Sequence, residues 1–200
     1  MSSRLGWSSH ITERIQLTGG GVTQLSRTAT QGHLSGARAR GRRGRSWTTP
    51  RGNFAATLMM PRKEPPGVAA LRSFVTSLAL YRSFVGVTGR EDAFALKWPN
   101  DVLLFDKKVC GILVESALSP NGEAYSISGI GVNTNLDVMD FSEIAETATS
   151  LHLHTNGNVS RLIVVQRLLN AFEGYYEQAR NGAPIINFWK DRLDTIGRLV

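Results

Sequence analysis

The stretch KWPNDVLLFDKKVCGILVES, residues 97–116, decides the fold. Two apolar runs, residues 102–105 and 109–114, have the aliphatic and β-branched composition of strands. The polar break DKK between them is short enough for a hairpin, and a second polar break, KWPND, precedes the first run. Lysines and carboxylates therefore stand beside strands whose other residues suit a core.

The sequence on either side continues this pattern of short strands. Residues 94–96 and 124–133 have the same strand-like composition, and the stretches WPND, DKK and SPNG that separate the strands have turn chemistry. Residues 54–60 predict a further strand after the turn signal PRGN. Short connections between successive strands favour an antiparallel arrangement.

Two amphipathic helices and one short helix complete the prediction. Residues 65–87 repeat apolar side chains at helical spacing, with Arg72, Thr76 and Arg82 expected on the solvent side. Residues 161–179 repeat the pattern, and a short helix is expected at 184–193. The fold class predicted is α+β: a mostly antiparallel mixed sheet with helices packed on one face.

The composition is that of one globular domain with a small appendage. Of the 200 residues, 42% are hydrophobic, and no stretch reaches the roughly 18 consecutive apolar residues of a membrane span. No apolar leader segment is present near residue 1. The single cysteine, Cys110, lies in an apolar run, which favours a buried thiol in a reducing compartment. We therefore expect a cytoplasmic protein with no membrane partner.

The positive charge is concentrated in the first quarter of the chain. The formal net charge is +7, and residues 1–51 hold nine arginines against a single acidic residue, so the remainder is close to neutral. Such clustering implies an anionic partner: nucleic acid, a membrane surface or nucleotide phosphates. Residues 1–37 are poorly patterned, so we divide the chain into that segment and a domain over 38–200.

The most basic stretch is RARGRRGRSW, residues 38–47. Its glycines let backbone N–H groups approach a ligand, and its arginines supply forked donors for phosphate or carboxylate. Trp47, just after the loop, is placed to cover a flat ligand. A solvated basic loop or a nucleic-acid-binding tail would have the same composition.

The turn KWPND also suggests a ligand. Pro99 rigidifies the turn, so that Asn100 and Asp101 project from a fixed position. A carboxylate beside an amide suits a magnesium–nucleotide complex, because Mg²⁺ usually takes one or two carboxylates and completes its shell with phosphate oxygens and water. The alternative is an ordinary hairpin turn in which Asp101 caps its own backbone.

Two further features point to the same chemistry. Lys108 begins an apolar strand, where a fixed ammonium can stabilise charge developing at a phosphorus centre, although most lysines between strands are simply exposed. In GIGVN, residues 129–133, alternate glycines leave one strand face bare for a ligand or for close packing. The amide of Asn133 can recognise a base edge.

The motif order GRRGRSW, KWPND, KKVCGILVE, GIGVN resembles the catalytic domain of biotin protein ligases, over residues 40–200. KWPND and the KxxGILVE pattern are highly specific, and lipoate ligases share the fold but usually lack this pair. The resemblance implies that ATP and biotin form biotinyl-5′-adenylate, and that biotin then passes to a lysine of a biotin carboxyl carrier protein. It implies Mg²⁺ as a cofactor, and it leaves the oligomeric state open, a homodimer included.

The resemblance also implies roles for individual residues. Lys108 contacts the biotin carboxylate and the α-phosphate and, with Arg42 and Asp101, forms the catalytic set; Asp101 also lies near the metal. The loop Arg40, Gly41 and Arg42 closes over biotin and the adenylate. The other implied binding residues are Arg43 and Arg45 for phosphates, Trp47 for the biotin tail, Asn100 for the Mg²⁺–triphosphate, Gly111 and Gly129 for the biotin pocket, and Asn133 for adenine.

Some features of the family pattern are not found. Ala37 and Ala39 stand where the family loop usually has glutamine and glycine, and residues 1–37 contain no convincing match to its Asp-Ser-Thr-Asn-like element. A C-terminal SH3-like module and an N-terminal helix-turn-helix are not recognised either, so a DNA partner is not expected. Two alternatives stay open: an inactive or truncated ligase remnant, and a basic nucleic-acid-binding module.

Overall fold

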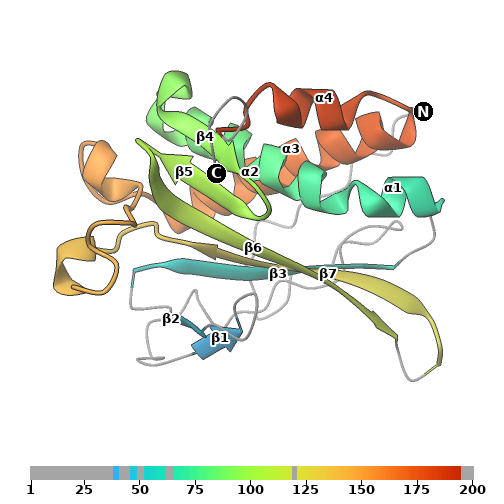
Figure 1. The fold of residues 1–200 in the computed structure, drawn as a ribbon, viewed down its shortest axis with the longest axis horizontal. Helices are drawn as coiled ribbons and strands as arrows, with labels where there is room; N and C mark the ends of the chain where they lie inside the picture. Colours follow the sequence, from blue (N-terminus) through green and yellow to red (C-terminus); the bar gives the residue numbers. More distant parts are fainter. Residues whose placement is uncertain (1–37, 41–45, 49–51, 62–64, 119–120, 195–200) are drawn as a thin grey trace.

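A five-stranded antiparallel sheet forms the centre of the computed structural model, which describes residues 38–40, 46–48, 52–61, 65–118 and 121–194 (Figure 1). The strand order is β3-β7-β6-β5-β4. The strands are β3 (Phe54–Pro61), β4 (Phe94–Lys97), β5 (Asp101–Leu104), β6 (Lys107–Leu118) and β7 (Ala124–Val132). The predicted strands are confirmed, and the chain from β4 to β7 runs as an antiparallel meander, with β3 added beside β7.

Four α-helices cover one face of this sheet (Figure 1). They are α1 (Pro66–Ala70), α2 (Arg72–Thr88), α3 (Arg161–Arg180) and α4 (Ile185–Lys190). The helix predicted over 65–87 is thus present with an interruption at Leu71. It ends at Gly89, whose φ of +69° forms a left-handed cap that glycine adopts without strain. The connections contain short 3-10 turns, η3 (Glu91–Ala93), η4 (Val138–Asp140) and η5 (His152–His154).

A separate two-stranded hairpin lies on the other side of the sheet. It consists of β1 (Arg38–Arg40) and β2 (Ser46–Thr48), which pair antiparallel. Figure 1 shows this hairpin below the sheet, with the helices above it. The basic stretch found in the sequence is therefore anchored on the side that the helices leave uncovered.

The main core lies between the sheet and the helices. Val75 and Leu78 of α2 are fully buried against inward-facing strand residues such as Leu58 and Val102. Helix α3 packs in turn on α2, and the Ser83 hydroxyl of α2 donates a hydrogen bond to the Val164 carbonyl at 3.0 Å. Burying a large aliphatic or aromatic side chain of this kind stabilises the fold by about 1.5–3 kcal/mol.

The solvent-side placement of Arg72 and Thr76 was wrong, because both are buried, at 2% and 0% exposure. The Arg72 guanidinium donates to the Met60 carbonyl at 3.3 Å, and the Thr76 hydroxyl donates to the Arg72 carbonyl at 2.7 Å. Backbone carbonyls thus accept one N–H of the Arg72 guanidinium and the Thr76 hydroxyl inside the fold. The buried face of α2 is therefore wider than its apolar stripe.

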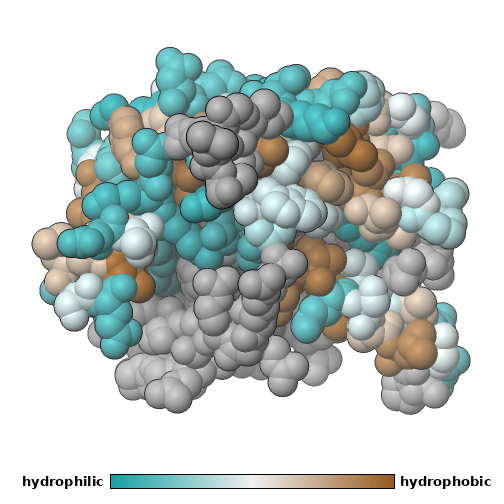
Figure 2. Space-filling view, viewed as in Figure 1, coloured by the Kyte–Doolittle hydropathy of each residue, from teal (hydrophilic) through white to brown (hydrophobic). Residues whose placement is uncertain are grey.

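Hydrophobic side chains are scattered among hydrophilic ones over the face drawn in Figure 2. They form no single broad patch among the residues coloured there. None of the described helices is long and apolar enough to cross a membrane.

Candidate functional site

Lys108 reaches the open face of the sheet because of a β-bulge. Val102 of β5 pairs with Cys110 of β6, but the next residue of β5, Leu103, pairs with Lys108. The register therefore shifts by one residue at Val109. Val109 and Cys110 are consequently both fully buried. If side chains alternated strictly along β6, Lys108 would lie on the same side as Cys110, which faces the core. The bulge instead directs Lys108 to the face that carries Asp101.

An ion pair fixes the lysine on this face. The Lys108 Nζ lies 2.8 Å from Oδ1 of Asp101, with side-chain exposures of 29% and 22%. This carboxylate oxygen is closed off from solvent, and Lys108 is the cation that approaches it. An ion pair with this exposure adds little to stability. It does hold the ammonium in one place, beside the glycines of β6 and β7.

Glycines line the sheet beside this ion pair. Gly111 of β6 pairs with Asp101 on one side and with Gly131 of β7 on the other, and Gly129 pairs with Leu113. A Cβ added at Gly129 would have the Leu113 carbonyl oxygen as its nearest neighbour, at 3.6 Å. That is an ordinary van der Waals contact. Close packing against the described residues therefore does not require glycine at 129, and a strand surface without side chains is suited to a ligand.

The main chain of Lys108 is held from the side by residues 147–149. Its N–H donates to the Thr147 carbonyl and its carbonyl accepts from the Thr149 N–H, both at 2.9 Å. Strand β7 ends at Val132, opposite Cys110. Beside Lys108, residue Ala148 of this segment pairs with β6 instead, in a parallel bridge. Residues 147–149 have no strand or helix periodicity, so sequence reasoning does not predict their contribution to the site.

Asn100 ties the KWPND turn to β6. Its Nδ2 donates to the Ile112 carbonyl at 2.9 Å, and the Ile112 N–H donates to the Asn100 carbonyl at 2.9 Å. The Trp98–Pro99 peptide within the turn is cis. The two hydrogen bonds to Ile112 fix Asn100, the residue before Asp101, so Asn100 positions the Asp101 carboxylate through the backbone.

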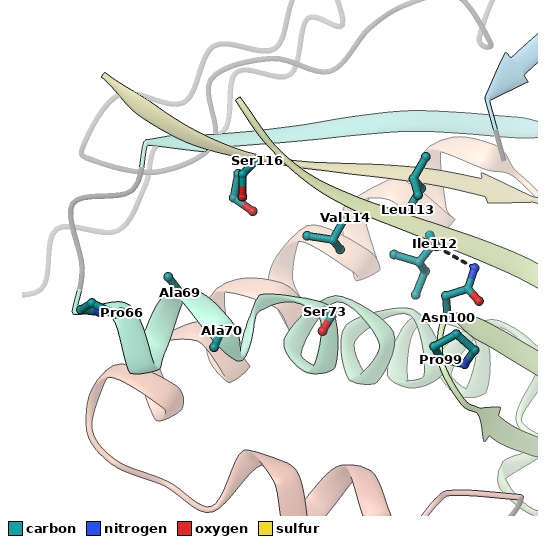
Figure 3. A pocket seen from close by; sticks show the side chains of 11 residues that line it. Pro66, Ala69, Ala70, Ser73, Pro99, Asn100, Ile112, Leu113, Val114 and Ser116 are labelled. Carbon is teal, nitrogen blue, oxygen red and sulfur yellow. Dashed lines mark hydrogen bonds between the residues drawn. The ribbon is translucent and has the colours of Figure 1, made fainter. Parts of the chain in front are cut away.

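A groove of about 400 Å³ lies on the helix side of the sheet, next to Asn100 (Figure 3). Figure 3 shows Ile112 and Val114 of β6 pointing toward the helices and Leu113 pointing away from them. Leu113 shares its face of the sheet with Gly111, Gly129 and Gly131, and we call this the glycine face. The groove and the glycine face therefore lie on opposite sides of β6. The groove is therefore distinct from the predicted site.

Asn133 is buried in a network of amides, at 4% exposure. Its Oδ1 accepts from Asn53 Nδ2 at 3.2 Å, and its Nδ2 donates to the Thr149 carbonyl at 3.1 Å. Asn53 Oδ1 in turn accepts from the Thr134 N–H. The side chain thus connects β3, the end of β7 and the segment beside Lys108. A direct contact with adenine stays a prediction.

We expect Asn133→Ala to destabilise the protein by about 2–4 kcal/mol, because it leaves Asn53 Nδ2 and the Thr149 carbonyl without their buried partner. Chemical denaturation measures the loss. Asn156→Ala, at an exposed position, is the matched control and should change stability by less than about 0.5 kcal/mol. A loss for Asn133→Ala no larger than the control's would show that the network carries no stability.

The remaining predicted residues belong to the basic stretch. Arg40 ends β1 and Trp47 lies in β2, within the hairpin on the uncovered side of the sheet. Gly41, Arg42, Arg43 and Arg45 lie outside the described residues. Among the described residues, no group of three or more His, Cys, Asp or Glu side chains forms a metal cluster.

The model of the biotin/lipoate A/B protein ligase family matches residues 36–135. The chain belongs to this family. A biotin–[acetyl-CoA-carboxylase] ligase of Paracoccus denitrificans is 35% identical over 158 residues, which are 79% of this chain and 61% of the relative. A bifunctional ligase/repressor of Bacillus subtilis is 32% identical over 165 residues, 79% of this chain and 49% of the relative. The chain thus spans about half to three fifths of these family members.

Solved structures of family members have the same fold. A biotin protein ligase of Aquifex aeolicus, in complex with biotin and ATP, gives a TM-score of 0.65 at 29% identity, over 78% of this chain and 64% of that one. A biotin protein ligase of Leishmania major gives a TM-score of 0.69 at 20% identity, over 90% and 74%, and supports the fold alone. The α+β fold predicted from the sequence is therefore confirmed as that of a biotin protein ligase catalytic domain.

Proposed function

We propose that the chain is an ATP-dependent biotin ligase, which forms biotinyl-5′-adenylate and transfers biotin to a lysine of a carrier protein. The observation that carries the proposal is the Lys108 ammonium, fixed 2.8 Å from Asp101 beside the glycine face of the sheet. Family membership supports it, as does the Aquifex aeolicus relative, whose structure contains biotin and ATP.

The first step joins two anions. A carboxylate oxygen of biotin attacks the α-phosphorus of ATP, and pyrophosphate leaves with the electrons of the broken P–O bond. Two unit charges 4 Å apart repel by about 4 kcal/mol at the effective dielectric of a protein surface. The Lys108 ammonium, placed between the carboxylate and the α-phosphate, offsets this repulsion and stabilises the charge that develops at phosphorus. The glycine face receives the fused rings of biotin.

The second step is an acyl transfer. The amine of the acceptor lysine attacks the biotinyl carbonyl, and AMP leaves. Asp101 lies at the start of β5 beside Lys108, where its carboxylate can orient the incoming ammonium before the amine loses its proton. The carrier protein as acceptor follows from the resemblance, and a homodimer stays a prediction.

The residues present fit a metal that arrives with the nucleotide. Magnesium needs only one or two protein carboxylates when phosphates and water complete its shell, and Asp101 offers one. The absence of a larger acidic cluster among the described residues agrees with such a shared site. When bound, the ion neutralises triphosphate charge. From the basic stretch, Arg43 and Arg45 would hold the phosphates, and the loop of Arg40, Gly41 and Arg42 would close over biotin and the adenylate.

The test incubates the purified chain with biotin, Mg²⁺ and radiolabelled ATP, and measures biotinyl-adenylate. Adding a biotin carboxyl carrier domain then allows transfer to be scored on a streptavidin blot. We expect both products. Adenylate without transfer would limit the function to the first step. Biotin binding by calorimetry without adenylate would identify an inactive remnant and overturn the proposal.

A further inference from the structure

The hairpin turn between β5 and β6 carries a residue that does not suit it. Phe105 and Asp106 have φ values of +49° and +61°. Two successive left-handed residues make a type I′ turn, which asparagine and glycine favour and a bulky aromatic residue disfavours. Phe105 is also 50% exposed, so burial does not explain its presence. A contact elsewhere must stabilise it.

That contact is with His154, at the end of η5. The two rings lie 5.0 Å apart between centroids and 40° from parallel. His154 Nε2 lies 2.8 Å from the Thr149 hydroxyl, and Thr149 is 3% exposed. The Thr149 N–H donates to the Lys108 carbonyl. A continuous series of contacts therefore runs from the exposed turn to the backbone of Lys108.

The bulge makes this support necessary. The register shift lies next to Lys108, which pairs with Leu103 of β5 on one side and is held on the other by residues 147–149 in place of β7. The inner side of that segment is anchored by Ala148 in a small apolar cluster with Leu136 and Val138. Its outer side rests on His154 and, through His154, on the Phe105 ring.

We propose that Phe105, His154 and Thr149 are positioning residues, which hold the bulged backbone of Lys108 so that its ammonium meets the reacting groups. The proposal rests on the proposed ligase function. It assigns these residues no contact with biotin or ATP. Their effect is on the geometry of Lys108, and therefore on the rate of adenylate formation rather than on ligand affinity.

The electrostatics around the imidazole agree with this role. Burial lowers the pKa of His154, and the positive charges of Arg90, His152 and Lys107 lower it further. The neutral ring is therefore favoured at neutral pH, and its Nε2 can accept the proton of the Thr149 hydroxyl.

Two substitutions separate positioning from a merely structural role. Phe105→Asn suits the turn better but removes the ring contact, and Thr149→Val keeps the shape but removes the hydroxyl. We expect each to slow single-turnover adenylate formation about tenfold, with the KM values for biotin and ATP changed less than about twofold. Phe105→Asn should be at least as stable as the wild type. Thr149→Ser should restore the rate, and Leu153→Asn, an exposed neighbour of His154, should not change it.

Amide hydrogen exchange supplies a readout that does not depend on activity. We expect Phe105→Asn and Thr149→Val to speed exchange at the Lys108 and Thr149 amides and not in α2. Unchanged exchange at these two amides would overturn the inference, whether or not the wild type is active. Unchanged rates in an active enzyme would also overturn it and leave the ligase function standing. A wild type that forms no adenylate would instead contradict the proposed function.

Discussion

Lys108→Gln will reduce biotinyl-adenylate formation by about a hundredfold to a thousandfold while leaving the protein folded. The glutamine side chain nearly matches the length of lysine but carries no charge to set against the carboxylate and the α-phosphate. The Asp101 oxygen that faces Lys108 is closed off from solvent, so removing the ammonium should cost about 1–3 kcal/mol of stability. Single-turnover formation of radiolabelled adenylate measures the first effect, and thermal unfolding measures the second.

The neighbouring lysine provides the control. Lys107 has the same charge and lies in the same hairpin, but it is exposed and its Nζ donates to the Ala145 carbonyl, at 3.4 Å. We expect Lys107→Gln to keep the wild-type rate within about twofold, because a solvated charge is screened. Equal losses in the two variants would mean that general positive charge, not a fixed ammonium, drives the reaction.

A methyl group added to the glycine face should weaken biotin binding while it raises the stability of the fold. Gly129→Ala places a methyl group where, among the described residues that are not its chain neighbours, the nearest atom is 3.6 Å away, so that part of the fold accommodates it. Removing glycine from a strand interior should raise stability by about 0.5–1 kcal/mol. The same methyl group occupies space proposed for biotin, and an overpacked site typically loses about 1–3 kcal/mol, roughly a tenfold to hundredfold weaker affinity. Gly129→Val should weaken binding further.

Calorimetric titration with biotin and chemical denaturation measure the two effects. Gly174→Ala is the matched control, because Gly174 lies on an exposed turn of α3 with open space around its Cβ position. It should add about 1 kcal/mol of stability and leave biotin affinity unchanged. Wild-type affinity in Gly129→Ala would exclude the glycine face as the biotin pocket.

The sequence predicted the sheet well because period-two patterns and turn residues are local signals. Every strand from β3 to β7 follows from such patterns. The helix expected over 161–179 follows from apolar residues at helical spacing, and the short helix expected over 184–193 is present as α4 but ends at Lys190. Arg72 shows where local signals fail, since its partner is a carbonyl on another element. From the sequence alone, a charged residue on a helix is expected to face solvent, because the position of the Met60 carbonyl is known only from the folded chain.

The candidate site was predicted in its composition but not in its geometry. Motif residues Asp101, Lys108 and Gly111 do meet on one face. The bulge that turns Lys108 to that face depends on pairing with β5 and on residues 147–149, neither of which leaves a pattern in the strand itself. Asn133 was selected for its amide chemistry, and only the folded chain shows that Asn53 and Thr149 engage that amide.

The most direct measurement is a map of where biotin binds, by amide NMR shifts of the full chain during titration. If biotin binds on the glycine face, the largest amide shifts should occur at Gly111 and Gly129, and Lys108 should also shift. Shifts confined to Ala69, Ser73 and Ser116 would place biotin in the groove on the helix side instead. That result would contradict the account, because the fixed ammonium would then lie on the wrong side of the sheet.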